Sequence, residues 1–301
     1  MKPTGITFVV LAWTALAPAQ QATTPQKQPP TQAETSQAAT TAAPAQGKRP
    51  PQAKTQAEFD AYKAAVVLSS DADAFAKATE DFAAKFHDSE LRILLFKASM
   101  HAFQNANNAE QMSATAEKVL KLDPDDPEAL VAAAEVIAEH TRDTDLDKDQ
   151  RWALAQKYAL RATETIDTDV AIPAGTPQEK IDAYKGFVRS SAYSVLGTVS
   201  FNQEKYPDAE GYFRKSIDAL PSQPDPVVVL RLAISLDKQS KYPEALKEAN
   251  HAVQLTEEAS VAGKLARQER DRLVQLTGGS VPAPADKPPA GAAQNQNPSP
   301  H

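Results

Sequence analysis

The chain has 301 residues, a net charge of −7 and no cysteine. The absence of thiols excludes disulfide bonds, thiolate metal sites, cysteine nucleophiles and a lipid-modified cysteine. Acidic and basic residues are mixed along the chain, and no block of lysine and arginine predicts a nucleic-acid surface.

Residues 1–19 have the pattern of a secretory signal peptide. Lys2 precedes an apolar run from Ile6 to Ala17, and the small-residue pattern that ends at Ala19 follows it. The alternative, an uncleaved membrane anchor, is disfavoured because the run is too short to cross a bilayer. We therefore expect cleavage after Ala19 and export to the periplasm or beyond it, with no lipid anchor and no membrane span.

Two flanking segments lack the residues that build a core. Residues 20–55 consist mainly of Gln, Ala, Thr and Pro, and residues 278–301 have the same character. Such segments bury too little apolar surface to offset the entropy that they would lose on ordering. The sequence therefore predicts a disordered linker and a disordered tail that act as semi-extended spacers.

The central region, residues 57–277, has the periodicity of amphipathic helices. Apolar residues recur every three or four positions, as in Leu91, Leu95 and Ala98, and no stretch alternates as a strand does. Turn-forming groups such as Asp123-Pro124 interrupt this pattern at intervals. We expect an all-α region whose helices have about a dozen residues.

One short phrase occurs twice in this region. QEKYPDA fills residues 203–209 and QSKYPEA fills residues 239–245, an offset of 36 residues. Tyr206 and Tyr242, each followed by proline, are predicted to open a helix, because proline lacks an amide that would have no partner there. The predicted unit is a helix, a tight turn and a second helix, and its period indicates units that bury their apolar faces against one another.

The residues of the first such unit follow a known pattern. Its large aromatic is Tyr193, its Leu-Gly pair is Leu196-Gly197, its small residue is Ala209, its second aromatic is Phe213 and its closing proline is Pro221. The next unit has Ala233 and Ala245 in matching positions, and Pro124 closes an earlier unit. This pattern resembles the tetratricopeptide repeat family. The resemblance implies a right-handed α-α superhelix, a solenoid of stacked helix pairs.

The chain divides into five predicted units and a final helix. The units span residues 57–90, 91–126, 127–169, 177–224 and 225–257, and residues 259–276 form a helix that covers the last exposed face. Thr176-Pro177-Gln178-Glu179 has the form of a capping box with proline at the first helical position. A helix that starts there is predicted to run to about Asn202, which is longer than a repeat helix normally is.

Candidate binding residues lie on the first helix of two units. Lys97, His101 and Asn105 are four residues apart and therefore share one helix face. The family resemblance implies that this face lines a concave surface, where lysine and asparagine can hold a partner's carboxylate. The matching face of a later unit carries Ser191, Ser194, Thr198, Phe201 and Asn202. The alternative interpretation is a solvated face with no binding role.

Two further patterns have competing interpretations. Val227, Leu230 and Ile234 form an apolar stripe, which is expected to be covered by the final helix or, alternatively, to be a contact site. Four aspartates alternate from Asp143 to Asp149 and are similar to the start of a calcium loop, but the glycine and glutamate that such a loop needs are missing. A polar loop with an aspartate at a helix N-terminus explains this run more simply. We assign no metal and no cofactor.

No enzyme motif occurs in the sequence. It contains no phosphate-binding loop, no G-x-S-x-G and no H-E-x-x-H, and its five histidines are scattered. The sequence therefore predicts a non-enzymatic exported scaffold or adaptor that binds a protein or peptide on the concave face. The alternative is a structural component that self-associates as a homo-oligomer.

Overall fold

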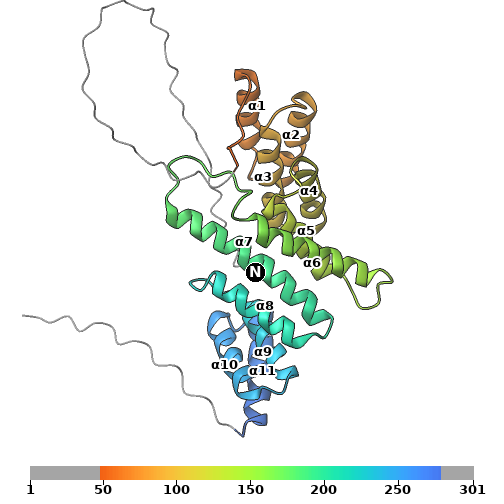
Figure 1. Ribbon diagram of the computed structural model, residues 1–301, viewed down its shortest axis with the longest axis vertical. Helices are drawn as coiled ribbons and strands as arrows, with labels where there is room; N and C mark the ends of the chain where they lie inside the picture. The colour runs from red at the N-terminus through yellow and green to blue at the C-terminus, as the bar shows by residue number, and fades with distance from the viewer. Residues whose placement is uncertain (1–47, 279–301) are drawn as a thin grey trace, which may run out of the picture. The chain divides into compact units, whose positions relative to one another are not determined.

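The computed structural model describes residues 48–278, in which it contains eleven α-helices and no strand (Figure 1). The helices are α1 (Gln56–Val66), α2 (Ala72–Lys85), α3 (Leu91–Asn105), α4 (Ala109–Leu122), α5 (Pro127–His140), α6 (Lys148–Thr165), α7 (Gln178–Asn202), α8 (Tyr206–Ala219), α9 (Pro226–Lys238), α10 (Tyr242–Leu255) and α11 (Val261–Leu276). The all-α prediction is confirmed for this part of the chain. The predicted signal peptide, most of the predicted linker and the predicted tail beyond Gly278 lie outside the described residues.

The helices pack mainly against their neighbours in the chain. Each helix from α1 to α10 contacts the next one, and the first helices of successive pairs also meet, as α5 does with α7 and α7 with α9. The final helix α11 packs on both α9 and α10. Packing between successive pairs is the architecture of a helical solenoid, in which no unit buries its apolar face alone.

The last two helix pairs share one apolar core. Phe213 of α8, Leu232 and Leu236 of α9, Leu246 of α10 and Leu273 of α11 are almost completely buried in it. Ala209 and Ala245, the small residues of the repeated phrase, are fully buried in the same core. Small side chains at these two positions let the second helices approach their neighbours closely.

Close packing also explains a glycine in the middle of α7. A Cβ atom at Gly197 would lie 2.4 Å from the ring of Phe213. A larger residue at this position would therefore have to displace a fully buried aromatic side chain.

The repeated phrase forms the same turn in both places. Glu204 and Ser240 have positive φ angles of 58° and 60°. The following amide closes the turn in each case: Lys205 N donates to Ser200 O at 2.9 Å, and Lys241 N donates to Leu236 O at 3.0 Å. Asn107, between α3 and α4, repeats this geometry with a φ of 53°. The turn needs a left-handed residue at one position, and glycine occupies that position in none of the three units.

The helix after residue 176 has the predicted length but not the predicted cap. It spans Gln178–Asn202, 25 residues, as expected. Pro177 is itself the N-cap residue, and no side chain caps the helix. Because Thr176 lies one residue outside the cap, its hydroxyl donates to Pro173 O at 2.9 Å instead. The predicted capping box is therefore wrong.

Residues 48–54 also differ from the prediction. Lys48 Nζ lies 2.7 Å from an Asp123 oxygen and 2.8 Å from an Asp169 oxygen, and Arg49 pairs with Glu90 at 2.7 Å. The prediction of a disordered linker up to residue 55 is wrong for this stretch. Ion pairs to turns distant in the sequence hold the segment, and composition alone does not indicate such pairing.

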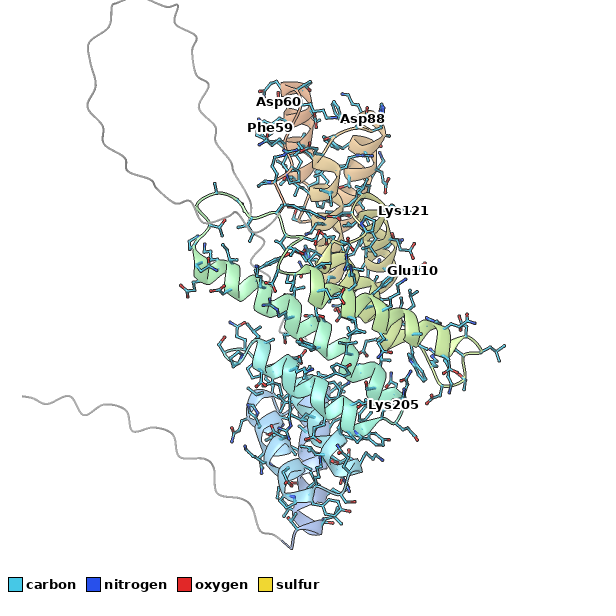
Figure 2. The ribbon with its side chains drawn as sticks, viewed as in Figure 1. Phe59, Asp60, Asp88, Glu110, Lys121 and Lys205 are labelled. Carbon is cyan, nitrogen blue, oxygen red and sulfur yellow. The ribbon has the colours of Figure 1, made fainter. Side chains whose placement is uncertain are left out.

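Charged side chains cover the outer surface of the helix pairs. Asp88, Glu110 and Lys121 are exposed, and Figure 2 shows them on the outside of the first two pairs. Within residues 48–278, no helix has the combination of length and apolar character that a membrane span requires.

Candidate functional site

The candidate site is the face made by the first helices α3, α5, α7 and α9, here called the first-helix face. The backbones of α5, α7 and α9 are in direct contact in that order, whereas α3 and α5 approach each other less closely. Side chains join α3 to α5. All the residues that the sequence proposed for partner binding lie on α3 or α7.

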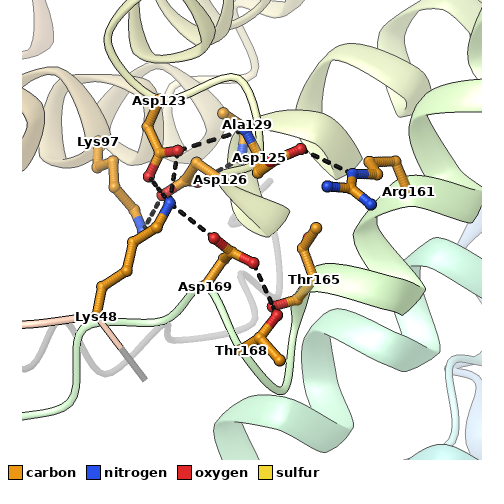
Figure 3. A network of polar contacts seen from close by, with 10 residues as sticks. All are labelled: Lys48, Lys97, Asp123, Asp125, Asp126, Ala129, Arg161, Thr165, Thr168 and Asp169. Atoms are coloured by element: carbon orange, nitrogen blue, oxygen red, sulfur yellow. Dashed lines mark hydrogen bonds and ion pairs between the residues drawn. The ribbon is translucent and has the colours of Figure 1, made fainter. Parts of the chain in front are cut away.

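Lys97 of α3 reaches the start of α5. Its Nζ atom lies 2.9 Å from Asp126 Oδ2 and 3.3 Å from Glu128 Oε1. Asp126 is the N-cap of α5 and accepts a hydrogen bond from Ala129 N at 2.9 Å (Figure 3). One lysine therefore neutralises a capping aspartate and the glutamate two residues after it.

Glu128 is the centre of this cluster. Besides Lys97, its carboxylate meets His101 Nε2 at 2.8 Å and accepts a hydrogen bond from the Tyr184 hydroxyl of α7. The cluster thus joins three successive first helices. Sequence reasoning found Lys97 and His101 but missed Glu128 and Tyr184.

The electrostatics of the cluster stabilise the charged forms. Burial alone would lower the pKa of Lys97, but the Asp126 and Glu128 carboxylates outweigh it and raise that pKa well above its usual value. Burial likewise opposes the charge on Glu128, yet Lys97 and His101 hold the pKa of Glu128 far below its usual range. The pKa of His101 is raised because its bond to Glu128 outweighs burial. Burial and the Glu128 charge raise the pKa of Tyr184 well above its usual value.

These contacts assign Lys97 and His101 a structural task. Both side chains are half-buried, and their polar atoms already bind Glu128. Asn105, the third predicted residue on α3, is exposed at the end of the helix. The structure does not bring it into the cluster.

A second polar group crosses from α5 to α9. Arg231 Nη1 of α9 lies 2.7 Å from Glu139 Oε1 of α5 and donates to Thr198 Oγ1 of α7 at 2.8 Å. Thr198 is buried under this contact, and Asn202 Nδ2 reaches Ala138 O of α5 at 3.5 Å. Two of the predicted α7 residues therefore make contacts between first helices.

Glu135 lies between Glu128 and Glu139 on the same side of α5. Its side chain is half-buried, and no hydrogen bond or ion pair joins it to another residue of the described chain. Burial and the nearby charges of Glu139 and Asp225 raise the pKa of Glu135 to about 7, and Arg231 only partly opposes them. The sequence spacing of Glu128, Glu135 and Glu139 indicates that they share one helix face. It does not indicate that Arg231 of α9 reaches this face of α5.

The two remaining predicted residues of α7 differ in their surroundings. Phe201 is half-buried, packs against the core of the last two pairs and meets the ring of Tyr206 edge to face, with 5.6 Å between ring centroids. Ser194 is half-buried on the first-helix face. Of this pair, Ser194 is the better placed to meet a partner.

The apolar stripe on α9 is partly covered. Leu230 is buried in a core with Ala266 of α11, and Ile234 packs on the same core. Val227 remains 40% exposed at the start of the helix. The expected covering by the final helix therefore holds for the middle of the stripe and not for its beginning.

The aspartate-rich insertion leads into α6. Asp147 is the N-cap residue of α6 but makes no side-chain cap, and Asp149 lies in the first turn. Asp145 Oδ2 accepts a hydrogen bond from Arg142 N at 2.9 Å. Among the described residues, no three histidines or carboxylates are grouped so that they could hold a metal ion.

A shallow hollow lies beside the Lys97–Asp126 pair, along the turns between helix pairs. The residues that line it include Lys48, Arg49 and Pro51, and also Glu90, Ile93 and Leu122. Figure 3 shows the polar contacts at its edge, where Lys48 meets Asp123 and Asp169.

Comparisons with known proteins give only distant likenesses. No family model and no curated protein matches the chain. One similar solved structure comes from a functional characterization of Pseudomonas aeruginosa pilF, with 18% identity and a TM-score of 0.49 over 75% of this chain and 96% of that one. Another is the assembly chaperone of RpL4, Acl4 (residues 1–338), with 13% identity and a TM-score of 0.41 over 73% of this chain and 98% of that one.

Neither likeness is close enough to transfer a partner or an activity. The fold follows from this chain's own geometry. Its helix pairs stack on one another, Gly197 packs against Phe213, and the same turn recurs in three units. The described part of the chain is an all-α solenoid of stacked helix pairs.

Proposed function

We propose that this chain is a non-enzymatic scaffold that binds a protein or peptide on the first-helix face. The observation that carries the proposal is the side-by-side placement of α5, α7 and α9. Half-exposed side chains of mixed character lie on these helices, among them Glu135, Ser194, Asn202 and Ile234. A segment laid across the face would meet several helices at once, which is how helical repeats bind their partners.

Glu135 favours a partner with a lysine or arginine. Glu139, Asp225 and Arg231 surround it, so that three carboxylates share one cation. A half-buried carboxylate that shares its nearest cation with two other carboxylates is unfavourable, and a partner's cation would compensate for it. The structural pairs around Glu128 lack this property because their charges are already neutralised.

Site-specific photo-cross-linking tests where the partner binds. A photoreactive residue at Ser194 is expected to form adducts with the partner in native extracts. The same residue at Lys157, exposed on α6, is the matched control and is expected to form few adducts. Equal labelling from both positions would contradict binding on the first-helix face.

Affinity for the partner thus identified provides the second test. Glu135→Lys is expected to weaken binding at least ~10-fold, since it replaces the partner-facing carboxylate with a like charge. Glu244→Lys, at an exposed position on α10, makes the same change in net charge and should leave affinity within about 2-fold. If both variants bind as the parent chain does, Glu135 takes no part.

Export is a separate part of the proposal and rests on the composition of residues 1–19. The mature chain is expected to begin at Gln20 and to be found in the periplasm or outside the cell. N-terminal sequencing of the native protein tests this expectation. A protein that retains Met1 or Lys2 would contradict it.

Self-association is the second candidate. Val261, Leu265 and Leu276 are exposed on the outer side of α11, with exposed fractions of 78%, 50% and 51%. Apolar side chains at the end of a repeat array could seat a second copy. Sedimentation equilibrium that shows oligomers, and monomers for Leu265→Glu, would favour this function over an adaptor.

A further inference from the structure

The turns between helix pairs make a second surface, which borders the first-helix face where Lys97 meets Asp126. Three successive turns each contribute one carboxylate: Glu90 before α3, Asp123 after α4 and Asp169 between α6 and α7. We call these three residues and their turns the turn edge. The chain's own residues 48–54, here called the latch, lie along it.

Two basic side chains of the latch bind all three carboxylates. Lys48 Nζ bridges Asp123 and Asp169 at 2.7 and 2.8 Å, and Arg49 Nη2 meets Glu90 Oε1 at 2.7 Å. The partners of Lys48 lie 75 and 121 positions further along the sequence. A consecutive Lys-Arg pair therefore matches three acidic groups that only the fold brings together.

The backbone of the latch is recognised as well. Gln52 N donates to Glu90 Oε2 at 3.0 Å, so that Glu90 binds both the side chain of Arg49 and the main chain. Lys54 Nζ donates to Asp88 O at 2.7 Å. Pro50 and Pro51 lack amide hydrogens, need no partner there and favour an extended backbone before binding. Recognition of charge, backbone and extended shape together is characteristic of a peptide-binding site.

The C-terminal end of the latch is fixed more firmly than its basic end. Lys54 N donates at 2.8 Å to Glu58, which is buried and also accepts a hydrogen bond from the Ser89 hydroxyl. Lys48 and Arg49 have side chains that are 40% and 60% exposed. Exposed ion pairs are weak and are screened by salt, so the basic end leaves first and the Lys54 end loosens after it.

We propose that the turn edge is a binding site for basic, proline-containing extended segments, and that residues 48–54 occupy it as an internal competitor. Partners of this kind gain access when the basic end of the latch leaves. Ile93 and Leu122, which line the hollow together with the latch, give such a segment an apolar contact beside the carboxylates. This site does not depend on the binding proposed for the first-helix face.

The test uses the full chain and a fluorescent peptide with the sequence of residues 47–53, GKRPPQA. The variant Lys48→Glu/Arg49→Glu repels its own latch from the turn edge and leaves the acidic site open. The peptide is expected to bind this variant at least ~10-fold more tightly than the parent chain, whose site is occupied. A peptide with both basic residues replaced by glutamate should not bind, and 1 M salt should weaken binding because it shortens the screening length to about 3 Å.

A matched variant controls for net charge. Lys247→Glu/Lys264→Glu alters two exposed lysines far from the turn edge in sequence and makes the same change in net charge. It should bind the peptide as weakly as the parent chain does. Equal peptide binding by the two double variants would overturn the proposal.

Trypsin cleavage after Lys54 reports whether the latch has left. Faster cleavage in Lys48→Glu/Arg49→Glu than in the control variant is the expected result. Faster cleavage without peptide binding would show that the turn edge is not a binding site. Unchanged cleavage would show that these charges do not hold the latch. Either result contradicts the proposal.

Discussion

The junction between α3 and α5 and the junction around α8 and α9 differ in how much half-buried charge they contain. At the first, Lys97 and His101 meet Asp126 and Glu128 across helices whose backbones stay apart. At the second, α8 and α9 pack through an apolar core centred on Phe213. The first junction, here called charge-held, adds this half-buried charge cluster to an apolar core that Phe96 and Met100 share with α5. The second, here called shape-held, has its buried contacts mainly in the apolar core.

This difference predicts where the chain responds to its surroundings. Apolar packing depends little on pH and is strengthened by stabilising salts. Half-buried ion pairs change with protonation, and their loss leaves an uncompensated charge. The charge-held junction should therefore be the one that responds to pH. A single side-chain truncation should nevertheless lower the free energy of unfolding more at the shape-held junction.

The largest effect is expected at the shape-held junction. Phe213→Ala removes a fully buried ring and leaves a cavity beside Gly197. The free energy of unfolding in urea should fall by about 3–5 kcal/mol. Phe59→Ala on α1, where the ring is only half-buried, is the control and should lose much less. A loss below about 1 kcal/mol for Phe213→Ala would mean that the core tolerates the cavity. It would contradict the claim that packing around Phe213 holds this junction.

The charge-held junction comes next. Glu128→Gln leaves Lys97 with Asp126 alone and removes the charge that faces His101. We expect a loss of roughly 2–3 kcal/mol in the free energy of unfolding. Glu139→Gln breaks the pair with Arg231, in which the glutamate is 45% exposed, and should lose less than about 1 kcal/mol. Equal losses would show that the ion pairs of Glu128 stabilise the fold no more than the exposed pair of Glu139 does.

The pH dependence of stability separates Glu135 from this cluster. Its folded pKa of about 7 lies above the ordinary value of 4.5, so the folded state holds a proton that the unfolded state has lost. Stability should therefore fall as pH rises from 4.5 through 7. Glu135→Gln removes this contribution and should stabilise the chain by on the order of 1–3 kcal/mol at pH 8, with little effect at pH 4.

His101 and Glu128 make the stability of the folded chain depend on pH in opposite directions. The raised pKa of His101 adds stability that is fully present below about pH 6.5 and is lost at higher pH. The lowered pKa of Glu128 adds stability above about pH 4.5 that is lost on acidification. Both contributions are present in Glu135→Gln and in the parent chain, so the difference between their urea unfolding curves from pH 4 to 8 measures Glu135 alone. A difference that does not change with pH would contradict the assignment to Glu135.

The sequence was sufficient for the helices because their signals are local. The three- and four-residue periodicity, the Tyr-Pro pairs and the breaks near Asp88, Asp123 and Pro221 all lie within a few residues of the structure that they predict. The N-cap of α7 was predicted wrongly although it too depends only on residues close by in the sequence. Proline occupied the cap position itself, which moved Thr176 outside the helix.

The contacts that define the candidate site could not be predicted from the sequence because they join residues far apart in it. Glu128 is joined to Tyr184, 56 positions away, and Arg231 to Glu139, 92 positions away. Lys48 reaches Asp169 from a segment whose composition predicts disorder. Pairing at these distances depends on the stacking of units, and a single sequence contains no signal that selects one partner for each charge.

The smallest effect concerns the repeated turn, where the shape-held region keeps a local strain. Ser240 has a φ of 60°, a left-handed conformation in which a Cβ atom is unfavourable and glycine is not. Ser240→Gly should therefore raise the free energy of unfolding by about 0.5–1 kcal/mol, and Glu204→Gly at the equivalent turn should do the same. Asn107→Gly should gain less, because asparagine already tolerates this conformation. Ser222→Gly, at an exposed turn residue without positive φ, should stabilise nothing. If Ser240→Gly lowers the free energy of unfolding, the serine side chain stabilises the turn. The left-handed conformation then does not strain the shape-held region.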